Sequence, residues 1–222
     1  MSEEIFLYWG SGSTPCWRVQ ITLEEKQLKY GEKIISFDKQ EHKSEEIMGL
    51  NPRGQAPTLK VGDKTINESI AACLYFEDVY KSQGTVLIPK EDQAQVLQRA
   101  FEALNLQKYC NENIVYYVWF TPVDKRDPQH LALKKKELNV EIQRWEDYLT
   151  KQNTEYIALN EFTFADVLFY PQLAFAVRSG YPIQKYPRLH KYYEMLKKRP
   201  SIEKTWPPHW KTTDNGTILS DC

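Results

Sequence analysis

The sequence has neither an excess of charge of one sign nor a long hydrophobic run. Its 29 lysine and arginine residues nearly balance 30 aspartate and glutamate residues, so the formal net charge is −1. A near-neutral chain lacks the bulk charge that attracts nucleic acid or an anionic membrane surface, and we expect neither partner. No apolar run approaches the roughly 18 residues that a membrane span needs.

Cysteine and histidine are also scarce. The four cysteines, Cys16, Cys73, Cys110 and Cys222, show no paired spacing. The start of the chain has no apolar segment typical of a secretory signal. The four histidines are scattered and form no metal-ligand pattern. We therefore expect a reduced, cytoplasmic protein that binds no metal.

Strand and helix signals alternate along the first 80 or so residues. An apolar segment, a helical stripe, a second apolar segment, a short helix, a hairpin around Gly62-Asp63 and a further helix follow one another. This order is that of a thioredoxin-like α/β domain. The expected strands span residues 5–9, 33–37, 58–61 and 65–66, and the expected helices span 15–28, 44–50 and a segment around 70–74.

Beyond a polar stretch, strand signals vanish and apolar residues recur at helical spacing. The segment from Thr163 to Asp166 is a variant of the capping box that precedes another apolar run. At 222 residues the chain is long enough for two domains. We expect a thioredoxin-like α/β N-terminal domain over residues 1–81, a linker over 82–92 and an all-α C-terminal domain over 93–222.

The loop after the first strand reads GSGSTPCWRV, residues 10–19. It is not a dinucleotide fingerprint, because Pro15 stands where the third glycine would be and has no N–H for a pyrophosphate. It matches the redox loop C-x-x-C with Ser13 in place of the nucleophilic cysteine. Since a helix N-terminus stabilises a thiolate, such a loop can stabilise the thiolate of a ligand.

Together these motifs resemble the cytosolic glutathione S-transferases, over nearly the whole chain. The spacing N-P-x-x-x-x-P-x-L followed by E-S is the most specific part, and several segments look most similar to the serine-type rho class. The resemblance implies the two-domain fold of that family, glutathione as co-substrate without a cofactor, a homodimer, and detoxification of apolar electrophiles. The segments that carry it are residues 13–19, 41–43, 51–59, 68–72 and 163–166.

The same resemblance assigns roles in holding glutathione. Ser13 is expected to stabilise the thiolate, with Ser11 as the competing hydroxyl. Glu68 and Ser69 are expected to take the γ-glutamyl ammonium and carboxylate, although Ser69 alone could simply cap its own helix.

Further contacts are expected from two other segments. Ala56, before a cis Pro57, would pair with the backbone of the tripeptide, although a trans proline at the start of a strand is also allowed. Gln55 would help to hold the γ-glutamyl or cysteinyl part. His42 and Lys43 would receive the glycine carboxylate, or form an ordinary solvated pair.

The second substrate needs an apolar wall. Tyr116, Tyr117 and Phe120 belong to an aromatic run that either lines this pocket or is core. The segment 206–210 (WPPHW) either folds back over the first domain or anchors the tail. Alternatives to conjugation are a glutathione-dependent isomerase or peroxidase and a non-catalytic binding module. The loop reads Gly12-Ser13-Thr14 rather than the S-S-C of the isomerases, which favours the transferase.

Overall fold

The computed structural model describes residues 3–222 and divides into two compact units. The first unit contains the chain up to residue 86 together with residues 200–212, and the second contains residues 87–199 and 213–222. The limits expected from the sequence, 1–81, 82–92 and 93–222, include no segment that returns to the first unit. The order of helix and strand signals along the sequence does not show that residues 200–212 pack into the core of the first unit.

A four-stranded mixed sheet with the order β2-β1-β3-β4 is the centre of the first unit. β1 pairs parallel with β2 and antiparallel with β3, and β3 forms a hairpin with β4. Leu7 and Leu59 lie opposite each other and are fully buried, so the middle of the sheet is apolar. The expected first strand and hairpin are confirmed. The strands are β1 (Ile5–Trp9), β2 (Gly31–Ile34), β3 (Thr58–Val61) and β4 (Lys64–Ile66).

The second strand lies earlier in the chain than predicted: the apolar run predicted a strand over residues 33–37, whereas β2 spans Gly31–Ile34. β2 pairs with β1 from Phe6 opposite Gly31 to Trp9 opposite Ile34, and β1 ends at Trp9. The register of the sheet therefore decides where β2 lies, and Phe37 falls outside the strand with 41% of its surface exposed.

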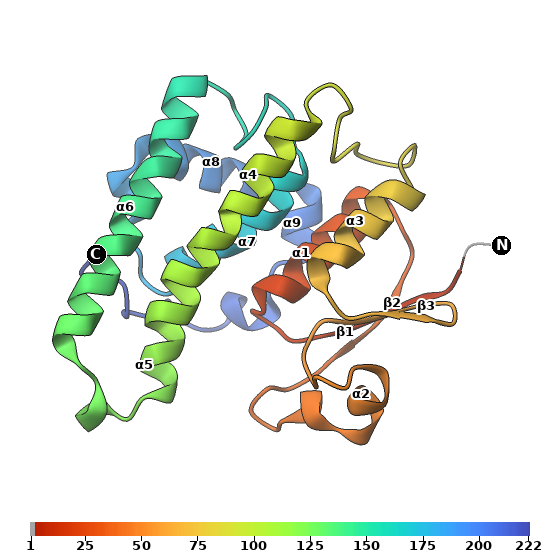
Figure 1. Cartoon of the computed structure of the whole chain (residues 1–222), viewed down its shortest axis with the longest axis horizontal. Helices are drawn as coiled ribbons and strands as arrows, with labels where there is room; N and C mark the ends of the chain where they lie inside the picture. The colour runs from red at the N-terminus through yellow and green to blue at the C-terminus, as the bar shows by residue number, and fades with distance from the viewer. Residues whose placement is uncertain (1–2) are drawn as a thin grey trace. The chain divides into compact units, whose positions relative to one another are not determined.

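Three helices complete the first unit: α1 (Thr14–Glu25), α2 (Glu45–Leu50) and α3 (Ser69–Val79). In Figure 1, α1 and α3 cover one face of the sheet and α2 lies on the other side. α1 ends before residue 28, the expected limit, because Gln27 adopts a left-handed conformation with φ of 52°.

An ion pair is buried between α1 and α3. Lys26, whose side chain is fully buried, places its Nζ 2.5 Å from Oε2 of Glu77 and donates a hydrogen bond to the carbonyl of Thr85. Taking two charges out of water has a large cost, and their mutual attraction offsets it only while both are present.

Removing one partner of this pair should therefore destabilise the protein more than removing both. Lys26→Met removes the cation beside the buried Glu77 carboxylate, and we expect the free energy of unfolding to fall by about 3–5 kcal/mol. The double variant Lys26→Met/Glu77→Met should recover most of that loss. Denaturant unfolding of the unmutated protein, the single variant and the double variant measures these changes in the free energy of unfolding. Equal losses in the single and double variants would contradict the idea that the unpaired charge causes the loss.

Helices form the second unit, with α7 in its core. Every residue of α7 from Phe164 to Ala176 is buried, and the helix continues through Pro171. α4 packs along α7, and a π-helical segment, η2, extends α4. The helices are α4 (Gln93–Leu106), η2 (Gln107–Tyr116), α5 (Tyr117–Phe120), α6 (Pro128–Gln152), α7 (Phe164–Arg178) and α8 (Pro187–Lys197).

The predicted capping box at the start of α7 is confirmed. The Thr163 hydroxyl accepts from the N–H of Ala165, and the Asp166 carboxylate accepts from the N–H of Thr163 at 2.8 Å. Asp166 also accepts from the Ile157 N–H and the Tyr192 hydroxyl. Burial raises the pKa of Asp166, and these hydrogen bonds oppose that rise by stabilising the charged form.

Short helices connect these elements: η1 (Glu41–Lys43), η3 (Val123–Lys125), η4 (Ile183–Lys185), α9 (Pro200–Lys204) and η5 (Pro208–Lys211). Within residues 3–222, no helix has the length and apolar character needed to cross a membrane.

Candidate functional site

Four loops of the first unit meet one edge of the sheet. β1 ends at Trp9, opposite Ile34, the last residue of the parallel β2. Antiparallel β3 begins at this edge, where Thr58 lies opposite Tyr8, and β4 ends there. The sheet thus gathers the segments predicted to bind glutathione. The four loops are residues 10–13, 35–43, 55–57 and 67–69.

Ser13 lies at the N-cap of α1. Its Oγ accepts a 3.4 Å hydrogen bond from the N–H of Cys16, and its own N–H donates to the carbonyl of Gly10. Because a hydroxyl can accept and donate at once, Ser13 can cap the helix and also donate a hydrogen bond. The helix dipole adds a favourable field for an anion at this position.

Cys16 is not the reactive thiol of a redox loop. Its side chain is fully buried, and burial raises its pKa to about 11. A thiol must ionise to act as a nucleophile. A thiolate at this loop would therefore belong to a ligand.

Ser11, the competing hydroxyl, has a partner from the far end of the chain. Its Oγ lies 2.5 Å from Nδ1 of His209, in η5. The sequence left open whether segment 206–210 folds back, and the structure shows that it packs within the first unit. No local pattern reveals this contact, because the two residues are 198 positions apart.

Lys43 lies against the loop that precedes the cis proline. Its Nζ donates to the Arg53 carbonyl at 3.0 Å, and its side chain is exposed. The neighbouring His42 is less exposed, and its ring lies 5.4 Å from that of Phe37. Burial, with a smaller effect of Lys43, lowers the pKa of His42. Nδ1 of His42 has no hydrogen-bond partner among the described residues.

The Ala56–Pro57 peptide bond is cis, as the resemblance implied. Asn51 holds the loop before it by donating from Nδ2 to the Gln55 carbonyl at 3.1 Å. Thr58 donates to the same carbonyl from its hydroxyl. The Gln55 side chain is exposed at this edge.

The N-terminus of α3 has no side-chain cap within the described chain. Glu68 occupies the N-cap position and is exposed, whereas Ser69 is the first helical residue. Ser69 therefore lies one residue after the N-cap position. An uncapped helix N-terminus presents free N–H groups to an anion.

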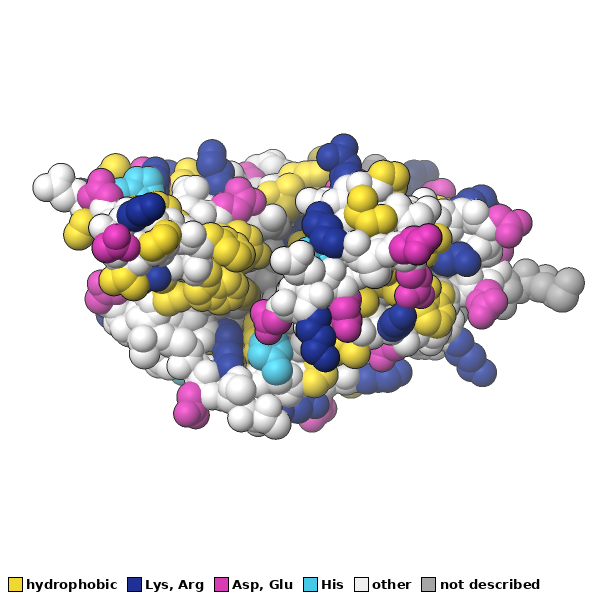
Figure 2. Space-filling view, turned by 90° about the horizontal axis from the view of Figure 1, so that it is seen from below, with side chains coloured by type: hydrophobic (Ala, Val, Ile, Leu, Met, Phe, Trp, Pro, Cys, Tyr) yellow, Lys and Arg dark blue, Asp and Glu magenta, His cyan; other side chains and the backbone are white. Residues whose placement is uncertain are grey.

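The aromatic run in the second unit divides into two groups. Tyr116, Trp119 and Phe120 form a cluster with Phe175, with ring centroids between 5.8 and 6.4 Å apart. Phe120 is 79% exposed, and Figure 2 shows hydrophobic side chains gathered on the surface of this unit. Tyr117 does not join the cluster, because its hydroxyl accepts from the Asp127 N–H at the start of α6.

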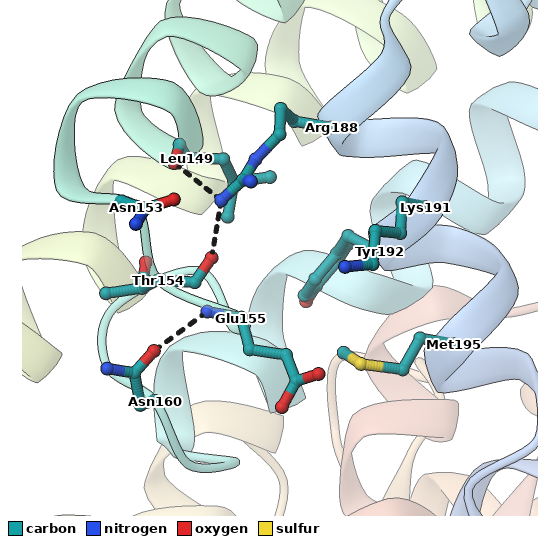
Figure 3. Close-up of a pocket in the computed structure, with 9 residues that line it drawn as sticks. All are labelled: Leu149, Asn153, Thr154, Glu155, Asn160, Arg188, Lys191, Tyr192 and Met195. Carbon is teal, nitrogen blue, oxygen red and sulfur yellow. Dashed lines mark hydrogen bonds between the residues drawn. The ribbon is translucent and has the colours of Figure 1, made fainter.

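The second unit also contains a cavity of about 180 Å³ between the end of α6 and α8 (Figure 3). No residue predicted to bind glutathione or the electrophile lines it. The Arg188 guanidinium, which lines this cavity, donates hydrogen bonds to the carbonyls of Leu149 and Thr154, both at 3.1 Å. The polar groups of this cavity thus mainly hold the loop after α6.

Comparison with known proteins identifies the class. Residues 12–79 match the model of the glutathione S-transferase N-terminal domain, and residues 108–205 match that of the C-terminal domain. Glutathione S-transferase A of Pleuronectes platessa is 45% identical over 219 residues, which cover 97% of both chains. This chain therefore belongs to the glutathione S-transferase family and is an enzyme of that family, as the sequence predicted.

A solved structure supports the same fold. A glutathione S-transferase from the Antarctic clam Laternula elliptica is 45% identical and superimposes with a TM-score of 0.89, covering 99% of this chain and all of that one. The fold prediction, a thioredoxin-like domain followed by a helical domain, is confirmed.

A more distant sequence relative is maleylacetoacetate isomerase maiA of Aspergillus fumigatus, 25% identical over 95% of this chain and 92% of its own.

Proposed function

We propose that this enzyme binds glutathione and transfers its thiolate to an electrophilic carbon of an apolar compound, with the Ser13 hydroxyl stabilising the thiolate. The position of Ser13 carries the proposal. It stands at the N-terminus of α1, where its oxygen accepts from a helix N–H, at the edge of the sheet that gathers the other proposed contacts.

The energies are adequate for such a role. An ordinary thiol has a pKa of about 8.5, and lowering it by two units takes about 2.7 kcal/mol. A hydrogen bond from a hydroxyl to a charged sulfur contributes roughly 1.5–3 kcal/mol. The N-terminus of a helix adds up to about 1 kcal/mol. The hydrogen bond from Ser13 and the N-terminus of α1 together can therefore supply the roughly 2.7 kcal/mol that lowers the thiol pKa by two units.

The rest of glutathione fits the same edge. We assign the γ-glutamyl carboxylate to Ser69 and the open N-terminus of α3, and the ammonium to Glu68. The Ala56 backbone would pair with the cysteinyl part, with Gln55 beside it. The remaining contacts, to the glycine carboxylate, are assigned to His42 and Lys43.

The aromatic cluster of the second unit supports an apolar second substrate. Tyr116 and Phe120, two of the three exposed rings of this cluster, are the ones that we assign to the electrophile, while Tyr117 would act by holding the start of α6. The physiological role that we propose is detoxification. The assignment to the rho class is supported by the sequence of residues 7–19 (LYWGSGSTPCWRV).

We also propose a cytoplasmic homodimer. The four cysteines are all unpaired, which fits a reducing compartment. Apolar side chains on α3 and α4, including Val79 at 52% and Phe101 at 48% exposed, would be covered by a second copy of the chain.

Substituting Ser13→Ala should lower the turnover of a chloro-nitrobenzene substrate by about 10- to 100-fold, because a charge-assisted hydrogen bond to the sulfur is lost. Retention on immobilised glutathione should change little. Ser44→Ala is a matched control, since Ser44 caps α2 through a 3.4 Å bond of the same kind and should not alter turnover. Undiminished turnover of the Ser13→Ala variant would refute the assignment.

Ser69→Ala should raise the KM for glutathione about tenfold and leave kcat nearly unchanged, because it removes a contact made equally in the ground and transition states. Ser179→Ala provides the control, since Ser179 lies in the second unit and is 6% exposed against 8% for Ser69. Steady-state kinetics measure the change. A loss confined to kcat would contradict the proposed role of Ser69.

The isomerase relative makes maleylacetone the sharpest alternative substrate. Chloro-nitrobenzene, an organic peroxide and maleylacetone should be assayed in parallel with the unmutated enzyme. We expect conjugation to exceed isomerisation, because the loop has Gly12-Ser13-Thr14 instead of S-S-C. Glutathione binding without turnover of any substrate would instead favour a binding module.

A further inference from the structure

Residues 200–212, which return to the first unit, are held on α1 by several side chains. Ser201 donates to the Glu25 carboxylate, Lys204 pairs with Glu24, and Trp17 is the largest buried side chain in this contact.

Trp17, which is 2% exposed, donates from Nε1 to the Thr205 hydroxyl at 2.8 Å. Its ring makes edge contacts with Trp206 and Trp210, at centroid distances of 5.3 and 5.6 Å. These two tryptophans lie on either side of His209 along the chain. The segment therefore has a defined position against α1.

This anchor places the imidazole of His209 over the loop that carries Ser13. Residues 10–13 form a turn closed by the hydrogen bond from the Ser13 N–H to the Gly10 carbonyl. Ser11 and Gly12 are its central residues, and Gly12 has a φ of 80°. His209 binds the side chain of the first and covers the second: a Cβ on Gly12 would lie only 2.8 Å from Cε1 of His209.

We propose that His209 is a positioning residue for the thiolate site. Its hydrogen bond to Ser11 and its contact above Gly12 hold the turn in one conformation, and the turn sets the direction of the Ser13 hydroxyl. A turn whose third residue has a positive φ can convert to another type by rotating its central peptide. Such a rotation would alter the start of α1.

This role also separates the two serines. The hydroxyl of Ser11 is engaged by His209, while the hydroxyl of Ser13 interacts with the N–H of Cys16 at the longer distance of 3.4 Å. Ser13 is thus the hydroxyl left to the sulfur, and Ser11 acts through the turn. The inference rests on the proposed function, because it concerns the site assigned to the glutathione thiol.

The test compares three substitutions at one position. Nδ2 or Oδ1 of asparagine can occupy the place of Nδ1 of histidine, whereas the amide of glutamine reaches the place of Nε2. His209→Asn should therefore retain most of the activity. His209→Ala and His209→Gln should each lower kcat about tenfold with little change in the KM for glutathione. The matched control, His190→Gln in α8, should not change either constant.

Two further measurements distinguish positioning from a general loss of stability. The pKa of bound glutathione, followed by the ultraviolet absorbance of its thiolate, should rise by roughly one unit in His209→Ala, which corresponds to the tenfold loss. In a Ser11→Ala background, His209→Ala should cause a smaller further loss than it does alone, because the shared hydrogen bond is already absent and only the contact above Gly12 remains to be removed. Thermal unfolding identifies any variant that does not fold; if His209→Ala fails, His209→Gln replaces it.

Unchanged kcat and thiol pKa in folded His209→Ala or His209→Gln would overturn the inference, and so would additive losses with Ser11→Ala. These outcomes require an unmutated enzyme that conjugates glutathione. An unmutated chain that conjugates no electrophile would instead refute the proposed function.

Discussion

The pairing of β1 with its two neighbours is the constraint on which the candidate site depends. Because Trp9 lies opposite Ile34 and Tyr8 opposite Thr58, the loops after β1 and β2 and the loop before β3 open at the same edge. A slip of one residue would turn the buried side chains of β1 toward the other face of the sheet. The register of β1 against its neighbours therefore fixes both the core and the place where ligand-binding groups meet.

The N-terminus of α1 combines a helix cap with the proposed thiolate site. Ser13 caps the helix through its oxygen, and the long 3.4 Å bond to Cys16 is a modest contribution to stability. A hydroxyl that accepts in this way can also donate. By contrast, α3 begins without any side-chain cap among residues 3–222. Both helix ends thus provide hydrogen-bond donors at one edge, one through a hydroxyl and the other through the backbone.

Local signals were sufficient for much of this arrangement. The hairpin turn, the short helix expected over residues 44–50 and the capping box at Thr163 involve residues close in sequence, and the family motif indicated the cis bond before Pro57. Long-range effects explain the predictions that failed. Pairing with β1 places β2 at residues 31–34 instead of the predicted 33–37. Likewise, the contact of Ser11 with His209 joins residues whose separation leaves no periodic trace.

The return of residues 200–212 to the first unit has a consequence for synthesis on the ribosome. Trp17 and its partner Thr205 are 188 residues apart, so this tryptophan stays uncovered while the intervening chain is translated. At about 5–20 residues per second, the delay is on the order of ten to forty seconds. During that time the ring contacts of Trp17 with Trp206 and Trp210 cannot form, so the first unit completes its packing only after nearly the whole chain has been made.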